Sequence, residues 1–111
     1  MRKPITIQDY LEDITESVKR IEKYIKGMNF SRFKESEITQ DALIRAFEVL
    51  GEATKKIPED FRKKYPEIPW KKMAGMRDKL IHDYWGVNVE RVWKTATEDI
   101  PKLKKEIDKI I

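Results

Sequence analysis

A regular spacing of apolar residues in the first quarter of the chain is the feature that most restricts its fold. Between residues 6 and 26, apolar side chains recur at alternating steps of four and three, and charged side chains fill most positions between them. Thr6, followed by Asp9, is a suitable N-terminal cap. This spacing predicts a helix with one apolar stripe, which must be buried against other elements. The stripe consists of Ile7, Leu11, Ile14, Val18, Ile21 and Ile25.

A second helix is expected over residues 37–57, with Ser36 as its cap. The preceding residues 27–36 form a connection that starts with Gly27, which would end the first helix in a left-handed conformation. The apolar residues of this connection predict that it packs on the body of the fold. Small residues on the second helix, together with Gly51, predict close approach of another helix, either the first helix or a second subunit. These small residues are Ala42, Ala46 and Ala53.

Prolines divide the second half of the chain. Residues 58–69 are expected to form a connection with a short helix starting at Pro58, and a third helix follows from Trp70 to His82 or Asp83. A last helical region begins after Asn88, with a kink near Ile100 because Pro101 cannot donate a backbone hydrogen bond. In the third helix, Gly75 predicts another close helix contact. The whole sequence, residues 1–111, therefore predicts one all-α domain, an antiparallel bundle of four to five helices.

The composition agrees with a small intracellular domain. The chain is 40% hydrophobic and 40% charged, with 24 basic and 20 acidic residues. The net charge of +4 permits nucleic-acid binding without requiring it. Cysteine is absent, and no apolar run is long enough to span a membrane. The first dozen residues contain Lys, Pro, Asp and Glu and no apolar stretch, so no signal peptide is expected. These features predict a cytoplasmic protein with no membrane association.

Residues 76–86 contain the only histidine of the chain, His82, with Arg77 five positions before it and Tyr84 two positions after it. Histidine acts as a general acid or base near neutrality, and arginine binds phosphate oxygens through its planar fork. One histidine without cysteine does not make a zinc site, so neither a metal nor another cofactor is expected. These groups suit RNA cleavage in which a base deprotonates the 2′-hydroxyl, the oxygen attacks the adjacent phosphorus, and a cation stabilises the negative charge that develops.

The spacing of the motif leaves alternatives open. On a helix, Arg77 and His82 diverge by about 140°, whereas Asp78 and His82 share one face. Arg77 and His82 converge if the helix ends near His82, or if a second copy of the chain supplies one of them. A homodimer would also supply two histidines for the two proton transfers. The alternative without catalysis is a histidine at a helix end, held by Asp78.

The pattern Arg77-Asp78-x-x-x-His82-x-Tyr84 resembles the R-x4-H-x-Y signature of HepT-like toxins, which are ribonucleases of the HEPN superfamily. The resemblance implies an all-helical, HEPN-like homodimer with its RNA site at the subunit interface. It also implies a minimal nucleotidyltransferase antitoxin that transfers AMP to the motif tyrosine, here Tyr84. The similarity spans nearly the whole chain and includes residues 65–70, 73–76 and 85–87, Phe47-Glu48-x-x-Gly51-Glu52-Ala53, and Asp99-Ile100-Pro101.

The sequence is therefore interpreted as the endoribonuclease toxin of a type II toxin–antitoxin pair. His82 is the predicted general base or acid, and Arg77 binds the scissile phosphate. Asp78 is predicted to orient His82 or to shape the site, and Tyr84 to position RNA. The resemblance also makes Tyr84 the candidate adenylylation site. Two alternatives remain, a non-catalytic HEPN binding subunit of a nucleotidyltransferase complex and a structural or regulatory helical dimer.

Charged residues elsewhere are weaker candidates. The cluster Arg62-Lys63-Lys64 and the loop residues Arg32 and Lys34 are candidates for phosphate contact, but a solvated surface is the favoured interpretation of both. On the second helix, Arg45, Glu48 and Glu52 are within possible reach of the site or of a partner. Ordinary surface or interface pairing is the favoured interpretation for those three.

Overall fold

The structure is a computed structural model that describes residues 5–82 and 88–110, except for the side chains of residue 77 and residues 79–82. Every regular element in this part of the chain is helical, which confirms the predicted all-α class. The elements are α1 (Ile7–Ile25), α2 (Phe30–Glu35), α3 (Glu37–Lys56), α4 (Glu59–Lys64), α5 (Trp70–His82), α6 (Val89–Lys94), the π-helical segment η2 (Thr95–Asp99) and α7 (Ile100–Ile107).

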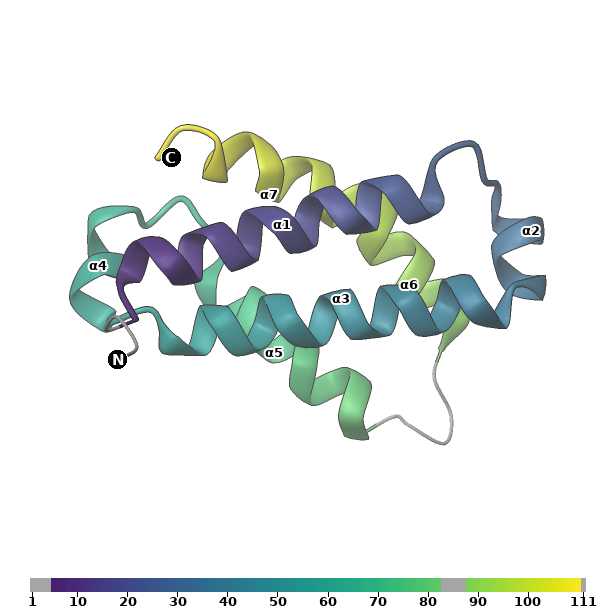
Figure 1. The fold of residues 1–111 in the computed structure, drawn as a ribbon, viewed down its shortest axis with the longest axis horizontal. Helices are drawn as coiled ribbons and strands as arrows, with labels where there is room; N and C mark the ends of the chain where they lie inside the picture. Colours follow the sequence, from purple (N-terminus) through teal and green to yellow (C-terminus); the bar gives the residue numbers. More distant parts are fainter. Residues whose placement is uncertain (1–4, 83–87, 111) are drawn as a thin grey trace.

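Two long helices form the centre of the bundle. Figure 1 shows α1 and α3 lying side by side in opposite directions, with α2 at the turn between them. Helix α5 packs on α3, and the segment from α6 to α7 returns along α1 and α3. The short helix α4 lies in the connection between α3 and α5. Within the described residues, the arrangement is the expected all-helical bundle, with the predicted short helix α4 and one unexpected short helix, α2.

The start and the end of α1 follow the sequence prediction. The Thr6 hydroxyl accepts a hydrogen bond from the Asp9 backbone N–H at 3.3 Å, and the Asp9 carboxylate accepts one from the Thr6 N–H at 2.8 Å. This reciprocal pair satisfies two donors that a helix start otherwise leaves open. Gly27 has φ 75°, in the left-handed region where a glycine is favoured. Between these ends, the apolar stripe is buried at its four central positions, Leu11, Ile14, Val18 and Ile21.

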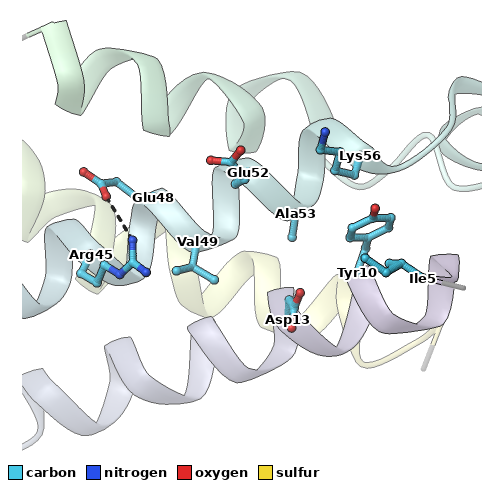
Figure 2. A pocket seen from close by; sticks show the side chains of 9 residues that line it. All are labelled: Ile5, Tyr10, Asp13, Arg45, Glu48, Val49, Glu52, Ala53 and Lys56. Carbon is cyan, nitrogen blue, oxygen red and sulfur yellow. Dashed lines mark ion pairs between the residues drawn. The ribbon is translucent and has the colours of Figure 1, made fainter. Parts of the chain in front are cut away.

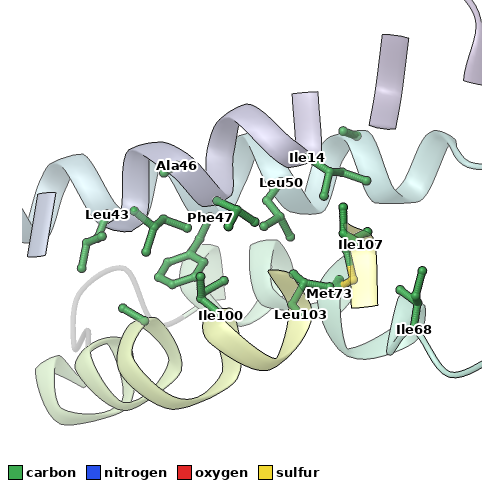
Figure 3. Packing of buried hydrophobic residues seen from close by; sticks show 14 of the residues in the cluster. Ile14, Leu43, Ala46, Phe47, Leu50, Ile68, Met73, Ile100, Leu103 and Ile107 are labelled. Atoms are coloured by element: carbon green, nitrogen blue, oxygen red, sulfur yellow. The ribbon is translucent and has the colours of Figure 1, made fainter. Parts of the chain in front are cut away.

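The core lies where α1 and α3 meet the α5 and α7 helices (Figure 3). Each contributing side chain is almost completely removed from water, and burial of one such side chain stabilises a fold by about 1.5–3 kcal/mol before opposing terms. This shared core packs the four helices against one another. The core side chains exposed by at most 2% include Ile14, Leu43, Phe47, Leu50, Met73, Ile100, Leu103 and Ile107.

The connection over residues 27–36 differs from its prediction because it contains a helix, α2. The Asn29 side chain caps this helix by accepting a hydrogen bond from the Arg32 N–H at 2.9 Å. Phe33 is fully buried, and its ring centroid lies 5.1 Å from that of Trp93. Six residues are too few to show helical periodicity, so the sequence does not distinguish such a turn from a loop. The predicted packing of this segment on the body is confirmed.

The predicted short helix is present as α4, which begins at Glu59 with Pro58 as its N-cap, one residue later than expected. Arg62 has a structural role that the sequence does not indicate. Its guanidinium donates to the backbone oxygen of Thr54 at 2.7 Å and to that of Ile57 at 3.1 Å. Arg62 therefore satisfies carbonyl groups at the C-terminal end of α3 and contributes a positive charge there. The neighbouring Lys63 and Lys64 are exposed, in agreement with a solvated surface.

The predicted irregularity before Pro101 is confirmed and takes the form of a π-helical turn. The chain stays helical from α6 through η2 into α7, and Pro101 stands in the first turn of α7. Pro101 has no N–H and its ring crowds the carbonyl four residues earlier, that of Thr97. The wider π-helical turn accommodates this crowding. Among the described residues, no helix is both long and apolar enough to cross a bilayer.

Candidate functional site

The Arg77, Asp78 and His82 positions of the signature lie in the C-terminal half of α5. The backbone positions of Arg77 and His82 are both helical, and α5 extends to His82 as predicted. The side chains of both residues, and all of Tyr84, lie outside the described residues. Because the helix runs through both positions, the two backbone positions are about 140° apart around the helix axis. The catalytic roles of Arg77 and His82 and the supporting role of Tyr84 therefore remain predictions.

Asp78 is the signature residue whose surroundings are described. The Lys55 ammonium on α3 lies 2.8 Å from Oδ1 of Asp78. This pair joins the last turn of α3 to α5, one helical turn before the His82 position. The sequence predicts a different contact, from Asp78 to His82. A carboxylate has room for several donors, so the bond from Lys55 is compatible with a second donor.

The side of α3 that carries Lys55 is rich in charge. Glu48 and Glu52 precede Lys55 by seven and three positions, which places all three on one side of the helix. Figure 2 shows the two carboxylates projecting from α3 toward α5. Arg45 pairs with Glu48 at 3.6 Å, which is the ordinary pairing that the sequence favours. The motif helix thus faces an α3 surface with both signs of charge.

A groove between α1 and α3 lies outside the signature region (Figure 2). Its larger part encloses about 530 Å³ and an adjoining part about 280 Å³, and both parts are lined by Asp13, Arg45 and Val49. Arg20 lines the smaller part, and its hydrogen bond to Glu16 raises its pKa above the ordinary value, with a smaller contribution from Tyr24. The lining mixes acids and bases, so the groove has no strong preference for an anion.

A second cavity, about 740 Å³ in volume, lies between α5 and the α6–η2 segment. We call it the basic cleft, because its lining includes four cationic residues and one acidic residue among those that the structure describes. Lys72 and Asp99 bridge it with an ion pair of 3.2 Å. The described residues that line the basic cleft are Lys71, Lys72, Gly75, Met76, Arg91, Lys94, Thr95 and Asp99.

Gly75 does not have the predicted close helix contact. A Cβ atom at Gly75 would contact no atom of another described element within 4 Å, because the position opens onto the basic cleft. The other glycine for which close packing was predicted, Gly51, is buried. A small residue on a helix therefore has two possible causes, a close neighbour or an open cavity, and the sequence does not separate them.

The sequence prediction missed the basic cleft for a similar reason. Its cations come from two segments separated by the signature, Lys71 and Lys72 on one side and Arg91 and Lys94 on the other. Each pair alone resembles an ordinary solvated surface. Only the placement of α6 beside the motif helix brings the four together. The available signal was a pair of cationic residues at each end of the signature.

The comparisons with known proteins agree with the all-helical bundle. The family model described as "Ribonuclease HepT-like" matches residues 14–110 of the chain. A protein of Thermococcus cleftensis named "Probable ribonuclease HepT" is 52% identical over 103 residues, which cover 93% of this chain and 94% of that protein. No solved structure matches the chain significantly.

Two further relatives carry names that refer to RNase activity. One, from Methanocaldococcus jannaschii, is 50% identical over 105 residues, covering 95% of this chain and 87% of that protein. The other, from Caldanaerobacter subterraneus, is 41% identical over 106 residues, covering 96% and 95%. The family model and the relatives cover the signature and nearly all of the bundle. The chain therefore belongs to the HepT-like ribonuclease family.

Proposed function

We propose that this protein is a metal-independent endoribonuclease in which Arg77 and His82 carry the chemistry. The main support is the family match, which extends over residues 14–110 and so includes both signature positions. The nearby basic cleft, with four cationic residues and one acidic residue among its described lining residues, is consistent with an anionic substrate. RNA is the substrate class that the names of the relatives indicate.

In the proposed reaction, His82 removes the proton from a ribose 2′-hydroxyl. The 2′-oxygen then forms a bond to the adjacent phosphorus, and the bond from phosphorus to the 5′-oxygen breaks. Arg77 stabilises the negative charge that develops on the non-bridging oxygens. The leaving 5′-oxygen takes a proton from a general acid. The products are a 2′,3′-cyclic phosphate and a free 5′-hydroxyl.

A homodimer gives this scheme its second proton-transfer group. Each chain has one histidine, and the Arg77 and His82 positions diverge on their helix by about 140°. A second copy with its own α5 at the interface would place His82 of one protomer near Arg77 of the other. In this arrangement Asp78, held by Lys55, fixes the adjacent turn of α5, and Tyr84 positions the RNA.

The cellular role that we propose is that of the toxin in a type II toxin–antitoxin pair. Its partner would be a minimal nucleotidyltransferase antitoxin, and Tyr84 would be the site of AMP transfer. The support for this role is the signature itself, in which the tyrosine follows the histidine by two positions. AMP on Tyr84 would add a charged, bulky group beside the site and would block RNA.

The test is RNA cleavage by the purified protein in EDTA, beside Arg77→Ala and His82→Ala. Mass spectrometry first establishes that Tyr84 is unmodified, and circular dichroism establishes that both variants are folded. The proposal expects cleavage by the parent protein and its loss in both variants. Equal cleavage by all three would place the activity elsewhere. Absence of cleavage by the unmodified parent would favour a non-catalytic HEPN binding subunit of a nucleotidyltransferase complex.

A further inference from the structure

We propose that the basic cleft binds the sugar-phosphate backbone of RNA at nucleotides flanking the scissile bond. Lys71, Arg91 and Lys94 are then positioning residues for the nuclease, since they hold RNA without touching the reacting atoms. The link to cleavage rests on the proposed function. The binding itself does not, because it is measured with RNA that cannot be cut.

The charge of the cleft supports an anionic ligand. Its four cationic side chains, Lys71, Lys72, Arg91 and Lys94, belong to exposed residues, and one acidic residue, Asp99, accompanies them among the described lining residues. Lys72 is paired with Asp99. Within residues 5–82 and 88–110, no ion pair involves the other three cations. Such a cluster attracts a polyanion and binds its phosphates with release of counterions.

The position of the cleft supports RNA rather than an unrelated anion. From Gly75 to His82 the helix advances seven residues, which is about 20° short of two full turns and about 10 Å along the axis. The two backbone positions therefore lie on the same side of α5. A strand lying in the cleft along this side of the helix would reach the His82 position within a few nucleotides.

The shape of the cleft depends on two local features. Gly75 leaves its floor without a side chain, although glycine in a helix costs roughly 1 kcal/mol relative to alanine. The π-helical turn η2 carries Thr95 and Asp99, which both line the cleft. A π-helical turn has more than four residues per turn, so residues four apart lie nearly on one side. Such turns occur frequently at functional sites.

The first experiment measures binding of a 2′-O-methyl RNA oligonucleotide by fluorescence anisotropy at several salt concentrations. This probe has no 2′-hydroxyl and cannot be cleaved by the proposed reaction. The test variant is Lys71→Ala, Arg91→Ala and Lys94→Ala combined. The control variant, with the same loss of charge, is Lys63→Ala, Lys64→Ala and Lys102→Ala combined, at exposed positions outside the cleft.

The cleft variant is expected to bind about tenfold or more weakly and to lose about two units of the slope of log K against log salt concentration. The control variant should stay within about threefold of the parent if the cleft is the main site. Equal weakening in both variants would overturn the proposal, because it would show diffuse attraction to a basic surface. Absence of binding by the parent protein would also overturn it.

A steric variant tests the cleft without changing its charge. Gly75→Gln puts a side chain into the cleft and favours the helix, so the fold should be retained. RNA binding should weaken at least several-fold, with little change in the salt slope. Unchanged binding by a folded variant of the same oligomeric state, measured by light scattering, would contradict occupancy of the cleft by RNA.

Failure of this inference and failure of the proposed function give different results. If the parent protein cleaves RNA but the cleft variant binds and cleaves like the control, RNA binding by the cleft is refuted and the proposed nuclease activity is retained. If the oligonucleotide binds through the cleft but no RNA is cleaved, the inference stands and the nuclease is wrong. If the cleft variant loses binding to an acidic protein partner but not to RNA, the cleft is a protein-docking site and the inference is wrong.

Discussion

Lys55 of α3 and Asp78 of α5 form an ion pair at 2.8 Å, one helical turn before the position of the single histidine. Both side chains are partly exposed, at 38% and 49%. A pair of this kind contributes little to stability, typically 0–1 kcal/mol, because water screens it. Its location at the motif helix indicates that its main effect is on the orientation of the site.

Replacement of Lys55 is therefore expected to affect cleavage more than folding. Lys55→Ala should change the free energy of unfolding by at most about 1 kcal/mol and lower kcat for RNA cleavage roughly tenfold through misplacement of α5 side chains. Lys55→Arg keeps the positive charge and should restore most of kcat. Urea denaturation and single-turnover cleavage measure the two effects. Equal kcat for the parent and Lys55→Ala would show that the Lys55–Asp78 pair does not orient the site.

Replacement of Arg62 is expected to affect folding more than cleavage, because its guanidinium binds two carbonyl oxygens at the end of α3. Arg62→Ala should lower the free energy of unfolding by about 1–2 kcal/mol, since hydrogen bonds from a charged donor are lost and a helix end is left open. The adjacent Lys63→Ala is the matched control and should stay within about 0.5 kcal/mol. Denaturation midpoints at one protein concentration test this. A stable Arg62→Ala would mean that water replaces the guanidinium without cost.

The two aromatic residues of α2 provide a paired test of its packing. Phe33 is fully buried at 5.1 Å from the Trp93 ring, whereas Phe30 is only partly buried at 6.4 Å from it. Phe33→Ala should cost about 3–5 kcal/mol by leaving a cavity, and Phe30→Ala clearly less. Both unfolding free energies come from urea titrations. Equal losses would show that α2 is not anchored through Phe33.

Replacement of Asp99 by asparagine is expected to strengthen RNA binding. Asp99→Asn removes the acidic side chain of the basic cleft and releases Lys72 from its 3.2 Å ion pair. RNA affinity should rise by about two- to fivefold at low salt, and this gain should shrink as salt is added. The matched control is Asp108→Asn, an exposed acid beyond the end of α7, which should have a smaller effect. Equal gains in both variants would reflect net charge alone.

The long helices could be predicted because each carries a stripe of its own and a recognisable start. Thr6 with Asp9, and Ser36 with Thr39, place the starts of α1 and α3 correctly, since the capping contacts are local. Helix α2 was missed because its stability comes from Phe33 against Trp93, a contact between distant parts of the chain. Local patterns do not contain that information.

The candidate site likewise has a part that local sequence patterns predict and a part that they do not. The Arg77-Asp78 and His82 positions follow from spacing and resemblance, and α5 extends to His82 as predicted. Lys55 and the basic cleft were not predicted, because each depends on which helices become neighbours. The sequence predicts close packing at Gly75, whereas this glycine lines the basic cleft. Contacts between helices that are distant in the sequence are the part of the site that a single sequence does not predict.

The most direct test of the proposed reaction uses an oligonucleotide with a single ribonucleotide in an otherwise 2′-O-methyl strand, incubated with the parent protein or His82→Ala in EDTA. The proposed reaction predicts one cut after that ribonucleotide, with a 2′,3′-cyclic phosphate and a 5′-hydroxyl identified by mass spectrometry, and no cut by His82→Ala. Cleavage at a 2′-O-methyl position, products with a 5′-phosphate, or unchanged cleavage by folded His82→Ala would contradict it.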